Sequence, residues 1–220
     1  MRRVVVFDLD GTLVNGDTYR RFLLGFIVRQ PKRLARTWSL PFALALYFSG
    51  VRDNSWLKTA FLTAVMGGVR RSELEEWSGS FVNDLIARGI RSRALARLRD
   101  HQAHGDYVIL ATASLDAYVE PLARRLGFDD VICSRVVWSE DGRLTGALAD
   151  GNCYGRRKAE CIARLLAASG RSEIDFAYSD HESDRPLLEW ARSAIAVSPT
   201  RALARWAKRR AIPIEDWGAA

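Results

Sequence analysis

Two aspartates near the start of the sequence have the clearest chemical potential. Asp8 and Asp10 directly follow the continuously apolar run Val4–Phe7. In an extended chain, side chains two residues apart project to the same side. Two carboxylates held this close repel each other unless a cation or a shared proton lies between them. The spacing therefore predicts a site for a hard metal such as Mg²⁺, with one carboxylate available as a nucleophile or a proton donor.

The elements that must position this pair alternate between strands and helices. We expect strands at 4–7, 107–111, 130–133, 174–178 and 194–197, helices at 93–104, 115–126, 156–168, 186–192 and 200–210, a hairpin joining 136–138 to 143–145, and an edge element at 212–214. Strands that alternate with helices form a mostly parallel sheet covered on both faces. The expected fold class is therefore α/β, with a doubly wound, mostly parallel, Rossmann-like core.

The span after the first strand has a purely helical pattern. Apolar periodicity predicts helices near 22–28, 34–48, 56–65 and 72–85, and the last of them opens with a Ser72-Glu73-Leu74-Glu75 capping box. We therefore expect an α-helical cap at 16–89, inserted into a catalytic core formed by 1–15 and 90–220. The Trp and Phe residues of this cap fit helix packing better than lipid contact.

Composition narrows the partners and the compartment. The net charge of +7 favours anionic partners such as phosphorylated metabolites and lipid surfaces, and no nucleic-acid-binding module is recognisable. Three cysteines without a C-x-x-C pair, and no evident signal peptide, predict a cytoplasmic protein. The uncharged stretch 37–51 is too short to span a bilayer.

Further polar residues follow the predicted strands and join the aspartate pair. In open α/β sheets, sites form outside the carboxyl ends of the strands. Residues at that edge are Asp8, Asp10, Thr112, Ser114, Asp180 and Asp184, and Lys158 opens a nearby helix. Ser114 could equally serve as the N-cap of the next helix. Acids for a metal, a nucleophile, hydroxyl and N–H donors and one lysine together point to phosphoryl transfer.

These motifs resemble those of the haloacid dehalogenase superfamily phosphatases along nearly the whole chain. Asp8-Leu9-Asp10-Gly11-Thr12 follows the family's D-x-D-G-T form, Thr112 its second motif, Lys158 its third, and Asp180 with Asp184 its D-x-x-x-D form. The gap of 102 residues from Asp10 to Thr112 (112 − 10) is similar to that of members with a cap between the first two motifs.

The resemblance implies a role for each matched residue. Asp8 would attack phosphorus and form a phospho-aspartyl intermediate, while Asp10 would protonate the leaving oxygen and then activate water. Mg²⁺ would bind the Asp8 carboxylate, the Asp10 main-chain carbonyl and Asp180, with Asp184 close behind. Thr112, with the neighbouring backbone N–H groups of Ala113 and Ser114, would hold the phosphoryl oxygens, and Lys158 would neutralise charge.

Within the superfamily the chain most resembles subfamily IB, the phosphoserine phosphatase-like branch, and within it the phosphatidylglycerophosphatase C-type enzymes. Such a resemblance implies a Mg²⁺-dependent phosphomonoesterase acting on a lipid phosphate such as phosphatidylglycerophosphate. The cap would then contact the inner face of the cell membrane peripherally. The alternative is a soluble phosphatase for phosphoserine or another phosphorylated alcohol, with Asp17 and Lys58 contacting the leaving group. A non-catalytic binding protein is the least favoured of the three.

Overall fold

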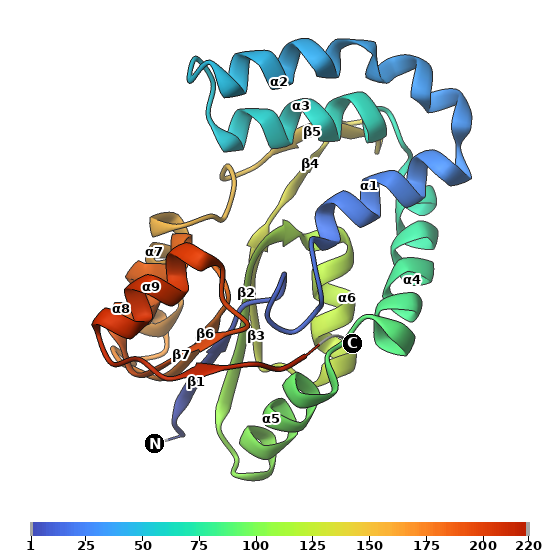
Figure 1. Cartoon of the computed structure of the whole chain (residues 1–220). Coiled ribbons are helices and arrows are strands. Elements are labelled where there is room, and N and C mark those ends of the chain that lie inside the picture. The colour runs from blue at the N-terminus through green and yellow to red at the C-terminus, as the bar shows by residue number, and fades with distance from the viewer. Residues whose placement is uncertain (1, 219–220) are drawn as a thin grey trace.

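A six-stranded sheet forms the centre of the molecule, which is a computed structural model describing residues 2–218 (Figure 1). Its strands are β1 (Val4–Phe7), β2 (Tyr107–Leu115), β3 (Asp130–Ser134), β6 (Ile174–Ser179), β7 (Ala191–Val197) and β8 (Ile214–Glu215). They lie in the order β3-β2-β1-β6-β7-β8, and each neighbouring pair is parallel. The expected parallel sheet is confirmed. The apolar strand β1 lies near its middle, with Phe7 opposite Leu110 and Tyr178.

Alternate side chains of β1 contribute to two separate cores. Val5 and Phe7 belong to one cluster of buried apolar residues, and Val4 and Val6 to another. The helices over the first face are α5 (Ser92–Ala103) and α6 (Asp116–Leu126), and those over the second are α7 (Arg156–Ala168), α8 (Arg185–Trp190) and α9 (Arg201–Arg209). A strand that is buried on both faces needs apolar side chains at every position, as the sequence of β1 has.

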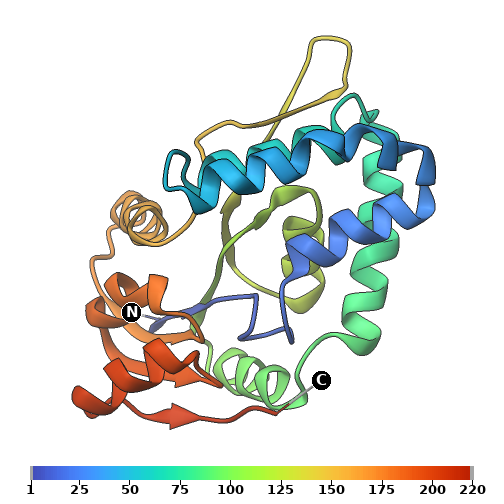
Figure 2. The ribbon, with the colours of Figure 1, turned by 45° about the horizontal axis from the view of Figure 1, so that its top comes forward.

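Helical segments fill the chain between β1 and α5. They are α1 (Thr18–Arg29), the 3₁₀ helix η1 (Pro31–Ser39), α2 (Leu40–Phe48), α3 (Asn54–Met66) and α4 (Arg71–Arg88). In Figures 1 and 2, α1 and α4 extend away from the sheet, and α2 packs on α3 at the far end. We call these segments the cap; its exact limits at 16–89 stay a prediction.

Two helix predictions for the cap are wrong. The expected helix at 34–48 is divided into η1 and α2, because Pro41 is tolerated only in the first turn of an α-helix. The expected capping box at Ser72 is absent, since α4 already begins at Arg71. The backbone N–H of Arg71 donates to the carbonyl of Gly142 at 3.1 Å, so a contact distant in sequence sets this helix start.

Two boundaries in the core also differ from expectation. Strand β2 continues to Leu115, so that 112–114 are part of the strand rather than a following loop, and the β2–β3 register shifts there. Helix α8 ends at Trp190, because Ala191 already pairs with Ile174 in the sheet. The edge element is confirmed as β8.

The expected hairpin is confirmed as β4 (Val136–Trp138) and β5 (Leu144–Leu148). It belongs to the core in sequence but packs on α3 of the cap. The N–H of Gly68 donates to the carbonyl of Leu144 at 2.7 Å, and the N–H of Leu144 donates to the carbonyl of Val69 at 2.8 Å. The hairpin therefore ties the core to the turn between α3 and α4.

Candidate functional site

The predicted site residues meet at the carboxyl end of the sheet, with Asp8 at the centre. The Nζ atom of Lys158 lies 2.7 Å from Asp8 Oδ1. The hydroxyl of Thr12 donates to Asp8 Oδ2 at 3.3 Å, and the backbone N–H of Asp8 donates to the Tyr178 carbonyl. Only 5% of Asp8 is exposed. Lys158 and Thr12 thus hold the two carboxylate oxygens, Oδ2 less strongly than Oδ1, while the backbone bond to Tyr178 fixes the position of Asp8 in the sheet.

Lys158 bridges two carboxylates from different elements. Its Nζ atom also lies 2.8 Å from Asp184 Oδ2, and the Ser179 hydroxyl donates to the same oxygen at 2.7 Å. Lys158 and Asp184 are both buried. Helix α7 therefore brings its one lysine to the ends of β1 and β6, as the sequence predicts.

This cluster has more carboxylates than positively charged groups, and the imbalance shifts the pKa values of its members. Burial raises the pKa of Asp8 well above its ordinary value; Lys158 opposes the shift, and Asp184, Asp180 and Asp10 add to it. Burial, with Asp184 close by, raises the pKa of Asp180 to about 7. For Lys158, burial alone would lower the pKa, but the carboxylates of Asp184 and Asp8 raise it above the ordinary value. A cluster with more carboxylates than cations favours a further positive charge.

The oxygen atoms present suit a hard cation such as Mg²⁺. Asp180 Oδ1 and Asp184 Oδ1 are buried and have no hydrogen-bond partner among the residues that the structure describes. Gly11 has φ +77°, and a Cβ atom there would lie 2.0 Å from Asp180 Oδ2. The glycine therefore leaves room for the Asp180 carboxylate beside the Asp8–Asp10 turn. Asp8 and Asp180 are the side chains that would hold the cation.

The side chain of Asp10 is turned away from this cation position. Its Oδ1 atom accepts the backbone N–H of Thr18 at 2.5 Å, and its Oδ2 atom accepts the hydroxyls of Ser114 at 2.7 Å and Thr112 at 3.4 Å. Within residues 2–218, no group of three or more Asp, Glu, His or Cys side chains is arranged to hold a metal. Asp10 could contribute only through its main-chain carbonyl.

Sequence reasoning missed Thr18 and Tyr118. The Thr18 hydroxyl lies 3.0 Å from that of Ser114 and 3.1 Å from that of Tyr118, and all three residues are buried. Thr18 is the first residue of α1, so the start of the cap is bonded to Asp10 of the core. The sequence does contain a signal for Thr18: it directly follows Asp17, a residue type that favours the N-cap, so Thr18 could have been placed at the start of a helix.

Of the two cap residues expected near the substrate, Lys58 donates to the core strand β2, whereas Asp17 caps α1 close enough to act on the charge of Lys58. Lys58 extends from α3, and its ammonium donates to the Ala113 carbonyl and, at 3.2 Å, to Asn152 Oδ1. Burial lowers the pKa of Lys58 to about 8, although Asp10 and Asp17 oppose the shift. Asp17 is exposed and caps α1 by accepting the N–H of Arg20 at 2.9 Å.

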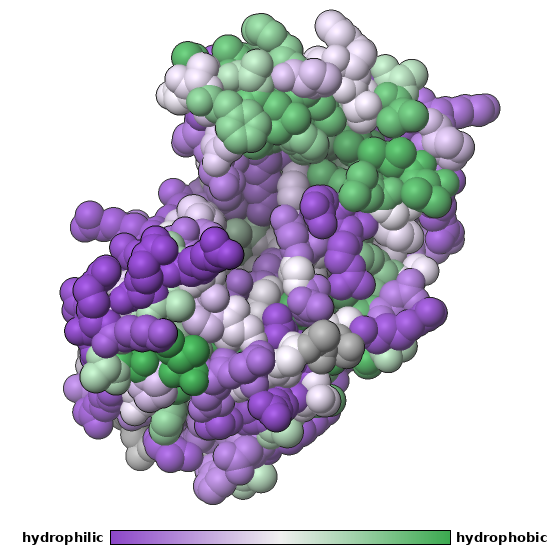
Figure 3. Space-filling view, viewed as in Figure 1, coloured by the Kyte–Doolittle hydropathy of each residue, from purple (hydrophilic) through white to green (hydrophobic). Residues whose placement is uncertain are grey.

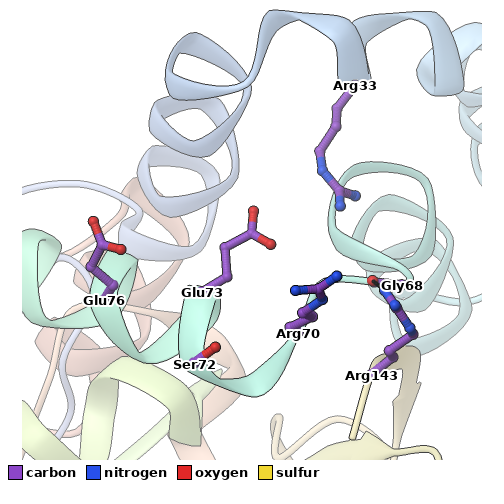
Figure 4. A pocket seen from close by; sticks show the side chains of 7 residues that line it. All are labelled: Arg33, Gly68, Arg70, Ser72, Glu73, Glu76 and Arg143. Carbon is purple, nitrogen blue, oxygen red and sulfur yellow. Dashed lines mark hydrogen bonds between the residues drawn. The ribbon is translucent and has the colours of Figure 1, made fainter. Parts of the chain in front are cut away.

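A separate surface pocket of about 410 Å³ lies between the cap and the hairpin (Figure 4). Its lining residues are Arg33, Gly68, Arg70, Ser72, Glu73, Glu76 and Arg143. Arg33 and Arg143 already donate to the carbonyls of Gly67 and Gly68. None of the residues that line this pocket belongs to the Asp8 cluster, so the pocket is not part of that site.

The sequence of this chain is similar to a known protein family and to several individual proteins. A family model described as haloacid dehalogenase-like hydrolase matches residues 5–189. The chain is 31% identical over 219 residues to the inhibition of morphological differentiation protein of Streptomyces azureus, covering 98% of this chain and 79% of that protein. It is 25% identical over 220 residues to a histidinol-phosphatase of Neisseria meningitidis serogroup C, covering 97% of this chain and 98% of that protein.

A solved structure extends the likeness to three dimensions. A protein of unknown function from Bordetella pertussis Tohama I superposes with a TM-score of 0.85 at 27% identity, covering 99% of this chain and 100% of that one. The sheet and the matched family model together define an α/β protein with a Rossmann-like core and a hydrolase family. The chain belongs to the haloacid dehalogenase-like hydrolases. Within that family it is a hydrolase of the phosphatase type.

Proposed function

We propose that the protein is a Mg²⁺-dependent phosphomonoesterase that works through a phospho-aspartyl intermediate on Asp8. The observation that carries this proposal is the pairing of a buried Asp8 with Lys158, beside the unpartnered oxygens of Asp180 and Asp184. A nucleophilic carboxylate needs a fixed orientation and a compensating positive charge, and this arrangement supplies both.

The two chemical steps divide between Asp8 and Asp10. An Asp8 oxygen attacks phosphorus, and the bond from phosphorus to the substrate's ester oxygen breaks as Asp10 gives that oxygen a proton. Water then attacks the phospho-aspartate, Asp10 takes the proton back, and the acyl phosphate bond breaks to release phosphate and regenerate Asp8. Lys158 stabilises negative charge on Asp8 and on the phosphoryl oxygens. A Mg²⁺ held by Asp8, Asp180 and the Asp10 main-chain carbonyl supplies further charge neutralisation when it is bound.

The hydroxyls of Thr112 and Ser114 have a double role in this proposal. Both contact Asp10 Oδ2, and the N–H of Ser114 donates to the Thr112 hydroxyl at 3.0 Å. They orient the proton-transferring carboxyl before substrate binds. When a phosphate enters, the same hydroxyls and the N–H groups of 113–114 can donate to its oxygens.

The test of the mechanism is Asp8→Asn, which preserves shape and removes the nucleophile. We expect kcat for a chromogenic phosphate with Mg²⁺ to fall by at least about a thousandfold. The matched control is Asp84→Asn, because Asp84 is an exposed acid on α4 whose one ion pair within residues 2–218 is with Arg88. Full activity of Asp8→Asn would contradict the mechanism.

For the substrate we propose a lipid phosphate such as phosphatidylglycerophosphate. Support comes from the cap, whose helices α1 and α2 leave large apolar side chains in solvent. The competing candidate is a soluble phosphorylated metabolite. It is favoured by the similarity to a histidinol-phosphatase and by the buried ammonium of Lys58 beside Ala113.

A substrate panel separates the two candidates. It compares phosphatidylglycerophosphate in mixed micelles with phosphoserine, histidinol phosphate and simple phosphorylated alcohols. A lipid substrate predicts the highest kcat/KM for the micellar phosphate. Turnover confined to one soluble phosphate would replace the lipid proposal with the metabolite one. The absence of all turnover would favour the non-catalytic alternative.

A further inference from the structure

The cap has an outer face rich in exposed apolar side chains. Among the described residues, nine large apolar side chains are exposed, and seven of them belong to this face: Leu24, Val28, Leu34, Trp38, Phe42, Phe48 and Val51. Figure 3 shows apolar surface gathered over the cap helices, in contrast to the largely hydrophilic surface of the core below. The expectation that the cap's aromatic residues fill its core therefore holds for Phe22, Phe26 and Phe81, but not for Trp38, Phe42 or Phe48.

Helix α2 is the centre of this outer face. Its nine residues, LPFALALYF, include no charged side chain. Leu40 and Ala43 are buried, whereas Phe42 is 68% exposed and Phe48 is 79% exposed. A surface helix normally presents polar residues to water, and a helix that is apolar all round is usually buried in protein or lipid. This helix has one side packed against α3 and η1, and one apolar side that stays exposed within residues 2–218.

The charge of the surrounding chain indicates what covers that side. From Thr18 to Arg52 the sequence has seven basic residues and no acidic one. Arg29 pairs with Glu76 of α4, while Arg20, Arg21, Lys32 and Arg52 are exposed and form no ion pair in residues 2–218. We call these four exposed basic residues the rim. The rim would repel a second copy of the same face, because a twofold interface sets the same patch against itself. It suits an anionic surface.

We propose that this outer face docks on an anionic lipid bilayer. Helix α2 would lie in the plane of the interface, with Trp38, Phe42 and Phe48 inserted between head groups and the basic residues on anionic lipids. Nine residues extend only about 14 Å, less than half the hydrocarbon thickness. Accordingly, no helix in the described chain is long and apolar enough to cross a membrane. The proposal concerns binding and does not depend on the proposed catalytic mechanism.

The test is flotation of the full chain with vesicles of phosphatidylglycerol and phosphatidylcholine, compared with phosphatidylcholine alone. We expect binding to the anionic vesicles that weakens as salt is added. The triple variant Trp38→Gln, Phe42→Gln, Phe48→Gln should bind at least about tenfold more weakly, because three inserted aromatic side chains are lost. These three positions are mostly solvent-exposed, so the variant should keep its turnover of a soluble chromogenic phosphate.

Matched controls separate docking from general attraction between a basic protein and an acidic membrane. Lys32→Gln, in the rim, should weaken binding more than Lys208→Gln on the basic helix α9, although each removes one charge. Equal binding of the triple variant and the parent protein would overturn the proposal. So would the absence of parent-protein flotation with anionic vesicles at low salt. A dimer in solution that the triple variant converts to a monomer would assign the outer face to a second copy instead.

Discussion

Lys158 supplies the positive charge that compensates two buried carboxylates of the site. One ammonium serves both Asp8, at the end of β1, and Asp184, in the 3₁₀ turn after β6. Removing it would leave two buried carboxylates without compensation, a change that typically costs several kcal/mol. The same contact therefore contributes to folding and to the proposed nucleophile, and substitutions of Lys158 will affect both.

Lys58 allows the energetic cost of a buried charge to be measured without removing a partner of the proposed nucleophile. Its pKa of about 8 in the folded protein lies below the ordinary lysine value of 10.5, and burial is the main cause. The folded state therefore binds fewer protons than the unfolded state between these two values, so stability rises with pH across that window. The burial penalty is present in full below pH 8 and is relieved as the pH approaches 10.5.

The prediction is a pH-dependent difference between Lys58→Met and the parent protein. Relative to the parent, the free energy of unfolding of Lys58→Met should fall by up to roughly 3 kcal/mol between pH 8 and pH 10.5. Urea unfolding followed at several pH values measures this difference. Lys208→Met, at an exposed position, is the control and should show no such trend. A difference that stays constant across the window would contradict the charge assignment.

The sequence predicts the acids and the lysine of this site and the two strand hydroxyls that contact Asp10, but it does not predict the further hydroxyls that pack behind them. Asp8, Lys158 and Asp180 follow apolar strands or open a helix, and strand-end geometry alone brings them together. Thr18 and Tyr118 carry no such signal, because their contact depends on how α1 and α6 pack. The side-chain direction of Asp10 likewise depends on these tertiary contacts.

At the scale of elements, the hairpin is the clearest link between cap and core. Gly146 of β5 has φ +91°, and a Cβ atom there would lie 2.2 Å from Thr63 Oγ1 on α3. Gly142, in the hairpin turn, has φ +71°, but no atom lies within 4 Å of its Cβ position. The two glycines share a left-handed backbone, but only at Gly146 would an added Cβ atom collide with the cap.

This pair predicts two different costs for the same substitution. Gly142→Ala should lower the free energy of unfolding by about 1 kcal/mol through backbone strain alone. Gly146→Ala should lower it by about 2–4 kcal/mol, because strain is added to the displacement of α3. Chemical unfolding of both variants gives the comparison. Equal losses would show that the hairpin does not press on α3.

The element predictions fail where tertiary contacts or proline override local pattern. Apolar periodicity locates the helices of the cap and the strands of the core, because burial imposes it on both. It does not reveal that Pro41 separates a 3₁₀ segment from α2, or that Gly142 fixes the first turn of α4. It also could not show which cap aromatics remain in solvent, since α2 is apolar on every side.

At the scale of the whole molecule, the crowded carboxylates oppose folding in the absence of a cation. Lys158 lies between Asp8 and Asp184, the charge of Asp184 also acts on Asp180, and one oxygen each of Asp180 and Asp184 has no hydrogen-bond partner in residues 2–218. A cation that binds only the folded state stabilises it by mass action, by about 2.7 kcal/mol at a hundred times its Kd. Mg²⁺ should therefore raise the Tm of the parent protein, and EDTA should reverse the rise.

Asp180→Asn separates this stabilisation from catalysis. The variant removes one negative charge from a buried acidic cluster, so its Tm without metal should equal or exceed that of the parent protein. It should lose most of the increase in Tm that Mg²⁺ gives the parent, because a cation ligand is weakened. Thermal unfolding of both proteins with EDTA and with Mg²⁺ provides the four values, and Asp84→Asn serves as the control that keeps the full increase. An undiminished Mg²⁺ effect in Asp180→Asn would place the cation elsewhere in the molecule.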